Sequence, residues 1–88
     1  MLRLTRTTRR PHEVVLVLEG QIIAQWVELL EDECLKLLTS QQNLSLDLAD
    51  VTYVDRRGAR LLREMAGRAV PLINCPPLVD ELIKEDAS

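Results

Sequence analysis

The stretch that decides the fold reads Leu44-Ser-Leu-Asp-Leu-Ala-Asp-Val-Thr-Tyr-Val-Asp-Arg-Arg-Gly-Ala-Arg-Leu-Leu62. Leucines alternate with polar residues at its start, which predicts an inner strand over residues 44–48. After Asp55, apolar residues recur at three- and four-residue spacing, and this spacing predicts an amphipathic helix that begins near Arg56. Asp55 is suited to cap that helix, because its carboxylate can accept hydrogen bonds from first-turn amides. We therefore expect a strand that leads directly into a capped helix.

Two strands and a helix are predicted before this stretch. Residues 2–8 alternate in polarity and indicate a half-exposed edge strand, whose arginines would discourage indiscriminate pairing. The continuous apolar run at residues 14–18 is typical of a strand covered on both faces, so a strand over 13–19 should be central. Apolar residues at helical spacing predict an amphipathic helix from Ile22 to Leu38.

A short strand and a last helix are predicted at the carboxyl end. Gly67 is placed to end the second helix, and residues 70–74 favour a strand in which Pro71 marks an edge or a strand start. Pro76 and Pro77 introduce the final helix. The order is β-β-α-β-α-β-α. Because each crossover between parallel strands should be right-handed, we expect an α/β fold with a four-stranded mixed sheet and helices packed against it.

Composition limits the classes of function. The chain has 88 residues, of which 47% are hydrophobic, so residues 1–88 are expected to form one domain with an aliphatic core. The net charge of −3 argues against general nucleic-acid binding. No apolar run is long enough to span a membrane, and we expect a soluble, cytoplasmic protein. Cys34 and Cys75 lie far apart without a metal-binding motif, so buried thiols are expected, with no metal and no cofactor.

Several of these segments together resemble the signature of the STAS domain family, named for sulfate transporters and anti-sigma factor antagonists. The resemblance rests on Gly20, Leu46-Asp-Leu48, Val51-Thr-Tyr-Val-Asp55, Gly58 and Ile73-Asn-Cys-Pro-Pro77. It covers nearly the whole chain and implies the mixed-sheet fold of that family. The segment after Gly20 and the connection from Met65 to Val70 are shorter than usual, which indicates a compact member.

The resemblance also shows a departure at the regulatory position of the family. In the anti-sigma factor antagonists, a serine directly before the glycine is phosphorylated by a partner kinase. Arg57 occupies that position here. Because arginine has no hydroxyl group, phosphotransfer at this position is excluded. Thr52 keeps a hydroxyl nearby, and we expect it to support the turn by hydrogen-bonding local backbone rather than to be modified.

A cluster of arginines follows the turn. Its members are Arg56, Arg57, Arg60 and Arg63. Cations at the amino end of a helix oppose the helix dipole, so their presence suggests another use, such as receiving a carboxylate or a phosphate. The alternative is local pairing, of Arg60 with Glu64 and of the first two arginines with Asp50 or Asp55. Both interpretations remain open at this point.

The leading hypothesis is a non-catalytic protein-interaction module that resembles an anti-sigma factor antagonist or a STAS subunit. Its partner would be an anti-sigma factor, a kinase-like protein or a transport complex, in a bacterial signalling context. The expected binding residues are Thr52, Asp55, Arg56, Arg57, Gly58, Arg60 and Arg63. The alternative is an anion or small-ligand sensor that uses the arginine-rich helix start. No enzyme is expected, because no phosphate loop or nucleophile–histidine pair is present, and a homodimer stays possible.

Overall fold

The computed structural model describes residues 1–85. Within them, the elements are β1 (Leu2–Arg10), β2 (Glu13–Ile22), α1 (Gln25–Thr39), β3 (Asn43–Val54), α2 (Arg56–Gly67), β4 (Leu72–Ile73) and α3 (Pro77–Glu85). The sheet has the order β1-β2-β3-β4, in which β1 is antiparallel to β2 and the other neighbours are parallel. The predicted fold class and element order are confirmed.

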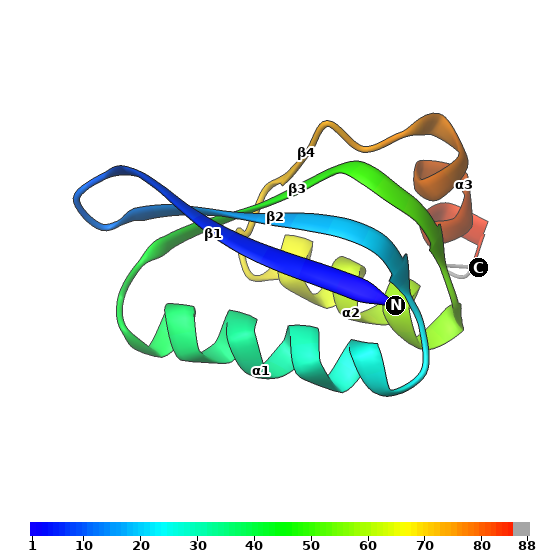
Figure 1. The fold of residues 1–88 in the computed structure, drawn as a ribbon, viewed down its shortest axis with the longest axis horizontal. Coiled ribbons are helices and arrows are strands. Elements are labelled where there is room, and N and C mark those ends of the chain that lie inside the picture. The colour runs from blue at the N-terminus through cyan, green and yellow to red at the C-terminus, as the bar shows by residue number, and fades with distance from the viewer. Residues whose placement is uncertain (86–88) are drawn as a thin grey trace.

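The helices α1 and α2 lie against one face of the sheet, and α3 packs beside α2 near the end of β3 (Figure 1). Between the sheet and the helices lies an aliphatic core, in which Leu16, Leu18, Leu46 and Leu48 are fully buried. Val15, the strand neighbour of Leu16, points to the other face. It is buried there among neighbouring strands and is not part of the core cluster. Residues of this strand are therefore buried on both faces, as the apolar run predicted, although α1 and α2 lie against one face alone.

The first predicted helix begins later than its apolar pattern indicates. Ile22 belongs to β2, and α1 begins at Gln25. The side chain of Ile22 is fully buried, and its carbonyl oxygen accepts a hydrogen bond of 3.1 Å from the Asp55 amide. Ile22 and Ile23 continue the apolar spacing of the helix in the sequence, and this is why the predicted helix began too early. The hydrogen bond with Asp55 keeps Ile22 in β2.

The last two strands also differ in length from the prediction. β3 runs on to Val54, because two register shifts against β2 each add one residue to β3. Such bulges let a strand keep pairing while its twist increases. β4 is confined to Leu72–Ile73. Pro71 has no amide hydrogen to donate, although its carbonyl oxygen still accepts from the Leu46 amide at 2.9 Å.

Both long helices end in a left-handed residue that is not glycine. Gln41 and Ala69 have φ angles of 60° and 65°. After α2, the Ala69 amide donates to the Ala66 carbonyl and the Val70 amide donates to the Met65 carbonyl, which is the bond pattern of a Schellman motif. The position that favours glycine is therefore Ala69, and Gly67 is the last helical residue rather than the stop signal.

The substitution Ala69→Gly should raise the free energy of unfolding by about 0.5 to 1 kcal/mol, because glycine adopts the left-handed conformation without the clash of a Cβ atom. Ala66→Gly is the matched control. Ala66 is exposed within α2, so glycine there should lower stability by about 1 kcal/mol. Urea denaturation followed by circular dichroism measures both changes. If both variants are destabilised equally, this account of the helix end is wrong.

Candidate functional site

The Asp55 side chain joins the starts of both long helices. Its Oδ1 atom accepts a hydrogen bond of 2.7 Å from the Gly58 amide, which caps α2 as predicted. Its Oδ2 atom accepts a second bond of 2.9 Å from the Ala24 amide, directly before α1. Ala24 has a φ angle of 50°, a conformation that an alanine rarely adopts. The carboxylate thus helps to hold an unfavourable backbone geometry, in addition to its capping role.

Gly58 allows α2 to approach the end of β2. A Cβ atom at this position would lie 2.5 Å from the Ile22 carbonyl oxygen and 3.0 Å from the Ile22 Cγ2 atom. Gly58 is also buried. Gly58 therefore shapes the turn. A partner would contact the exposed residues beside Gly58 rather than Gly58 itself.

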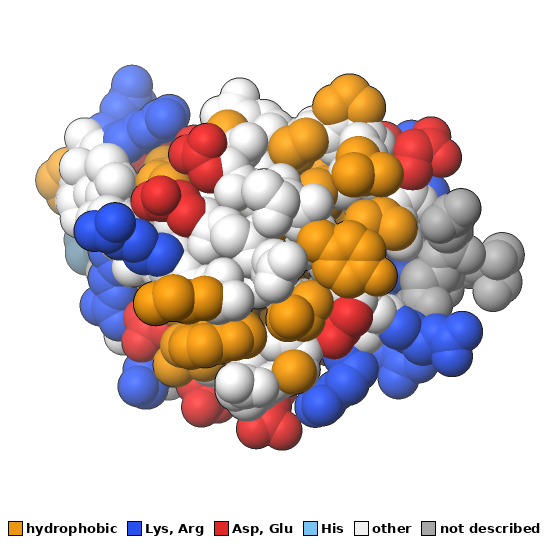
Figure 2. Space-filling view, turned by 45° about the vertical axis from the view of Figure 1, so that its right-hand side comes forward, with side chains coloured by type: hydrophobic (Ala, Val, Ile, Leu, Met, Phe, Trp, Pro, Cys, Tyr) orange, Lys and Arg blue, Asp and Glu red, His pale blue; other side chains and the backbone are white. Residues whose placement is uncertain are grey.

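Thr52 and Tyr53 lie side by side in sequence at the exposed end of β3. The Thr52 hydroxyl donates to the Gly20 carbonyl oxygen at 3.2 Å. The predicted bond to backbone is present, but its acceptor lies on β2 rather than in the local turn. Tyr53 is 45% exposed, and our sequence reasoning did not place it in the site. This end of the molecule faces forward in Figure 2, where apolar side chains gather beside basic ones.

The four arginines of α2 divide into different roles. Arg57 forms an ion pair of 3.4 Å with Glu28 of α1, and both side chains are largely exposed. Arg63 is partly buried, and its Nη1 atom donates to the Ile83 carbonyl oxygen of α3 at 2.9 Å. A cation near the end of α3 is electrostatically favourable, so Arg63 helps to attach that helix. Arg56 and Arg60 are exposed.

Local pairing was the alternative considered for these arginines, and for Arg57 the partner differs from the one expected. Arg57 pairs with Glu28 across the two helices, while both oxygens of Asp55 accept backbone amides. Arg57 and Arg60 line a shallow groove of about 140 Å³ between α1 and α2, together with three glutamates. These glutamates are Glu28, Glu31 and Glu64. The groove therefore has mixed charge rather than a uniformly positive lining.

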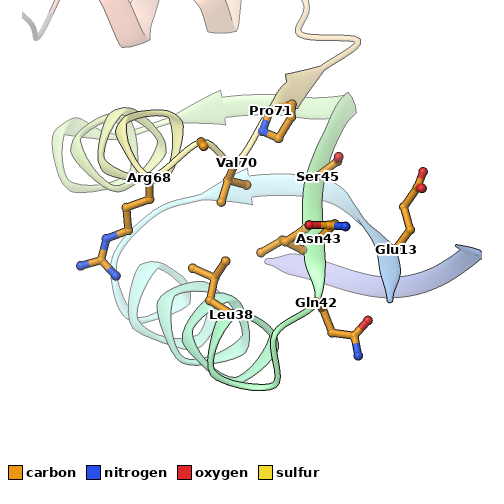
Figure 3. Close-up of a pocket in the computed structure, with 10 residues that line it drawn as sticks. Glu13, Leu38, Gln42, Asn43, Ser45, Arg68, Val70 and Pro71 are labelled. Atoms are coloured by element: carbon orange, nitrogen blue, oxygen red, sulfur yellow. The ribbon is translucent and has the colours of Figure 1, made fainter. Parts of the chain in front are cut away.

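A separate hollow of about 390 Å³ lies at the opposite end of β3 (Figure 3). Glu13 and Arg68 lie on opposite sides of it, and Leu38 and Val70 supply apolar walls. None of the predicted site residues lines this hollow. Sequence reasoning missed it, because its walls come from the ends of both long helices and the starts of two strands.

The two cysteines are free thiols in different environments. Burial raises the pKa of the Cys34 thiol to about 12, so it stays protonated and behaves as a core residue. Cys75 is only partly buried, which departs from the expectation for this thiol. Across residues 1–85, no group of three or more His, Cys, Asp or Glu side chains is arranged to hold a metal ion. No helix in the same range is sufficiently long and apolar to span a bilayer.

Comparisons with known proteins agree with this geometry. The family described as "Mlab, STAS domain" matches residues 5–84. The structure of the anti-sigma factor antagonist SpoIIAA in its unphosphorylated form superposes with a TM-score of 0.73 at 17% identity, covering 97% of this chain and 81% of that one. The crystal structure of Mglu gives 0.65 at 25% identity, with 85% of this chain matching 20% of that one. No curated protein sequence matches significantly.

The turn itself generates a stability prediction. Gly58→Ala should lower the free energy of unfolding by about 2 to 3 kcal/mol, because the new methyl group would overlap the Ile22 carbonyl. Asp55→Ala should cost about 2 kcal/mol through the loss of the cap. Gly67→Ala is the control: nothing lies within 4 Å of the added atom, so stability should rise by about 1 kcal/mol. Thermal denaturation compares the three variants, and a neutral Gly58→Ala would refute the close-approach argument.

Proposed function

This chain belongs to the STAS domain family, and on that premise we propose that it is a non-catalytic protein-interaction module that resembles an anti-sigma factor antagonist. The observation that carries the proposal is the exposed surface at the start of α2. There Tyr53, Arg56 and Arg60 are exposed around a turn that Asp55 holds by two hydrogen bonds. A held turn loses little conformational entropy when it binds a partner.

The chemistry of this surface favours a protein with acidic groups around an apolar contact. An aromatic side chain that is half exposed can supply contact area, and neighbouring guanidinium groups can bind carboxylates through paired hydrogen bonds. The ion pair between Arg57 and Glu28 is exposed, so exchanging Glu28 for a partner carboxylate would cost little. We infer that an anti-sigma factor, a kinase-like protein or a transport complex is the partner, rather than a nucleic acid.

We further propose that partner binding is not switched on or off by phosphorylation at the turn. Arg57 stands where the phosphorylated relatives have serine, and it contributes permanent positive charge. Thr52 is exposed, but its hydroxyl is already hydrogen-bonded to Gly20. Its direction toward β2 supports a structural role. We also propose that residues 1–88 act as one domain in the bacterial cytoplasm.

The anion-sensing alternative has weaker support. An anion at the start of α2 would have to displace the Asp55 carboxylate, which already accepts from the Gly58 amide. The nearby groove contains three glutamates beside its two arginines, and these carboxylates would repel an anion. These contacts support the proposed partner surface more than they support an anion pocket.

Affinity capture from the native cells, followed by quantitative mass spectrometry, tests the partner surface. Arg60→Glu should reduce recovery of the specific partner at least about tenfold, because one contact changes from attraction to repulsion. Arg68→Glu makes the same change at the other end of α2, where it should leave recovery unchanged. Circular dichroism should confirm that both variants are folded. Equal recovery by the wild type and both variants would contradict the proposed surface.

Phosphorylation is tested on protein isolated from the same cells. Intact mass spectrometry and peptide mapping should find residues 52–58 without phosphate, both in growing and in starved cells. The reason is that Arg57 has no hydroxyl group on which a phosphate ester could form, and the Thr52 hydroxyl is directed to the Gly20 carbonyl. A stoichiometric phosphothreonine at position 52 would refute the constitutive interpretation while leaving the protein-binding proposal intact.

A further inference from the structure

We propose that the free edge of β1 is a second binding surface, which accepts an extended segment in which aliphatic and acidic side chains alternate. Strand addition to a sheet edge is a general mode of peptide recognition, in which main-chain hydrogen bonds provide affinity and alternate side chains provide specificity. β2 separates this edge from β3 and the turn at Asp55, so the inference does not depend on the proposed function.

The backbone register shows which groups face the free edge. Within residues 1–85, β1 pairs only with β2. The Gln21 amide donates to the Met1 carbonyl at 3.0 Å, so these two residues form a hydrogen-bonded antiparallel pair. Such pairs alternate with pairs that are not hydrogen-bonded to each other. Four residues of β1 therefore direct their N–H and C=O groups outward: Leu2, Leu4, Arg6 and Thr8.

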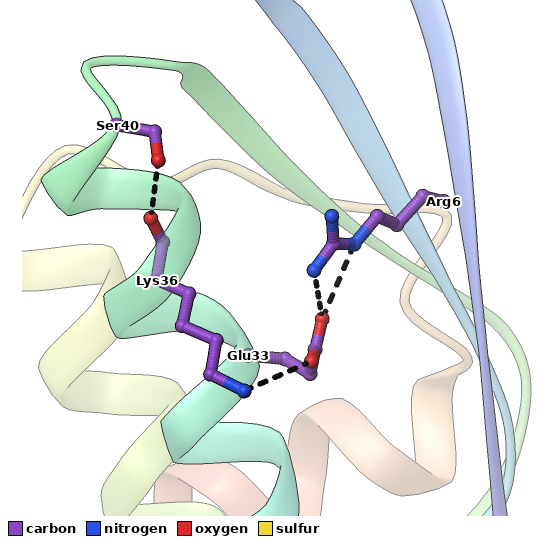
Figure 4. A network of polar contacts seen from close by, with 4 residues as sticks. All are labelled: Arg6, Glu33, Lys36 and Ser40. Carbon is purple, nitrogen blue, oxygen red and sulfur yellow. Dashed lines mark hydrogen bonds and ion pairs between the residues drawn. The ribbon is translucent and has the colours of Figure 1, made fainter.

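An apolar groove follows the same edge on the helix side of the sheet. It has a volume of about 400 Å³ and is lined by Leu2, Leu4, Leu16 and Leu29, of which Leu29 is 44% exposed. Arg6 borders the groove. Its Nη2 atom lies 2.6 Å from the Glu33 Oε2 atom, and the Lys36 Nζ atom lies 3.9 Å from the Oε1 atom (Figure 4). An aliphatic side chain of an added strand would enter this groove.

The other side of β1 carries a different chemistry. Arg3, Thr5 and Thr7 are exposed on this side, away from α1, and Arg9 is exposed at the register shift that follows Thr8. Glu19 of β2 lies opposite Arg3, whereas Arg9 lies in the register shift between Thr8 and Arg10 and has no paired residue on β2. Successive side chains of an added strand point to opposite faces. The segment that fits both sides therefore places aliphatic residues toward α1 and acidic residues toward Arg3 and Arg9.

The charge of β1 argues against a second copy of this chain as the occupant. Antiparallel pairing of two β1 strands about Arg6 would put Arg6 opposite its counterpart and Arg3 opposite Arg9. Like charges directly opposite one another destabilise a strand pair. At the other edge of the sheet, β4 consists of Leu72–Ile73 alone, which is too short to guide an added strand. The arginines thus disfavour a basic strand, and an identical strand in this register, and they favour an acidic one.

The test is a titration of the full chain with two nine-residue peptides, one alternating valine with glutamate and the other alternating valine with lysine, followed by NMR amide shifts. The glutamate peptide should shift amides of β1 and of α1 around Leu29, and the lysine peptide should not bind. Equal binding of both peptides, or shifts confined to the start of α2, would overturn the proposal.

Two pairs of variants separate strand addition from simple charge attraction. Thr8→Pro removes an outward N–H and leaves the bonds to β2, so it should weaken binding at least tenfold, whereas Thr8→Ala should have no effect. Arg3→Glu with Arg9→Glu should transfer binding to the lysine peptide. Arg60→Glu should bind the glutamate peptide as the wild type does, because Arg60 belongs to the surface at the start of α2. This variant therefore separates failure of the present proposal from failure of the proposed function. Light scattering measures the oligomeric state of the wild type and of Thr8→Pro. If the wild type is a dimer and Thr8→Pro is a monomer, a second copy of the chain occupies the edge and the acidic occupant is refuted.

Discussion

The fold depends on the junction where Asp55, Ile22 and Gly58 meet. The Asp55 amide donates to the Ile22 carbonyl, and its two carboxylate oxygens accept from amides at the starts of α1 and α2. The junction fixes the spacing between the end of β2 and both helices. Gly58 is the residue that permits this spacing, since a larger side chain would collide with Ile22. Loss of the bond to Gly58 would leave the amide of a buried residue without its partner, which is costly in the interior.

This dependence explains how the turn can keep its shape while its chemistry changes. Asp55 and Gly58 carry the geometry, whereas positions 56 and 57 point outward and tolerate arginine. A hydroxyl group at position 57 is not needed for folding. The structural role of the turn therefore does not depend on the side chain at position 57, and the resemblance to unphosphorylated SpoIIAA at 17% identity extends to the fold alone.

Charge is distributed so that the arginines perform unequal tasks. Arg63 attaches α3 to α2, Arg6 attaches β1 to α1, and Arg57 links α2 to α1 through Glu28. Arg60 is exposed and lies at a groove that also contains acidic residues. In the sequence, the arginines of α2 suggest one basic patch. In the structure, Arg57 and Arg63 contact other elements, and Arg56 and Arg60 remain exposed near the end of β3 that carries Tyr53. Ion pairs between elements specify how the elements are oriented more than they stabilise the protein.

The sequence by itself determined the element order, the aliphatic core and the cap at Asp55, because these depend on local periodicity and on hydrogen bonds within one turn. It did not locate the start of α1, since Ile22 and Ile23 fit both a strand and a helix pattern. Only the tertiary structure decided that Ile22 stays in β2, where the distant Asp55 amide binds it. The same holds for the partners of Arg57, Arg63 and Thr52, which lie at least 20 residues away in sequence. Such pairings depend on how the helices and strands are packed, and no spacing within a segment encodes them.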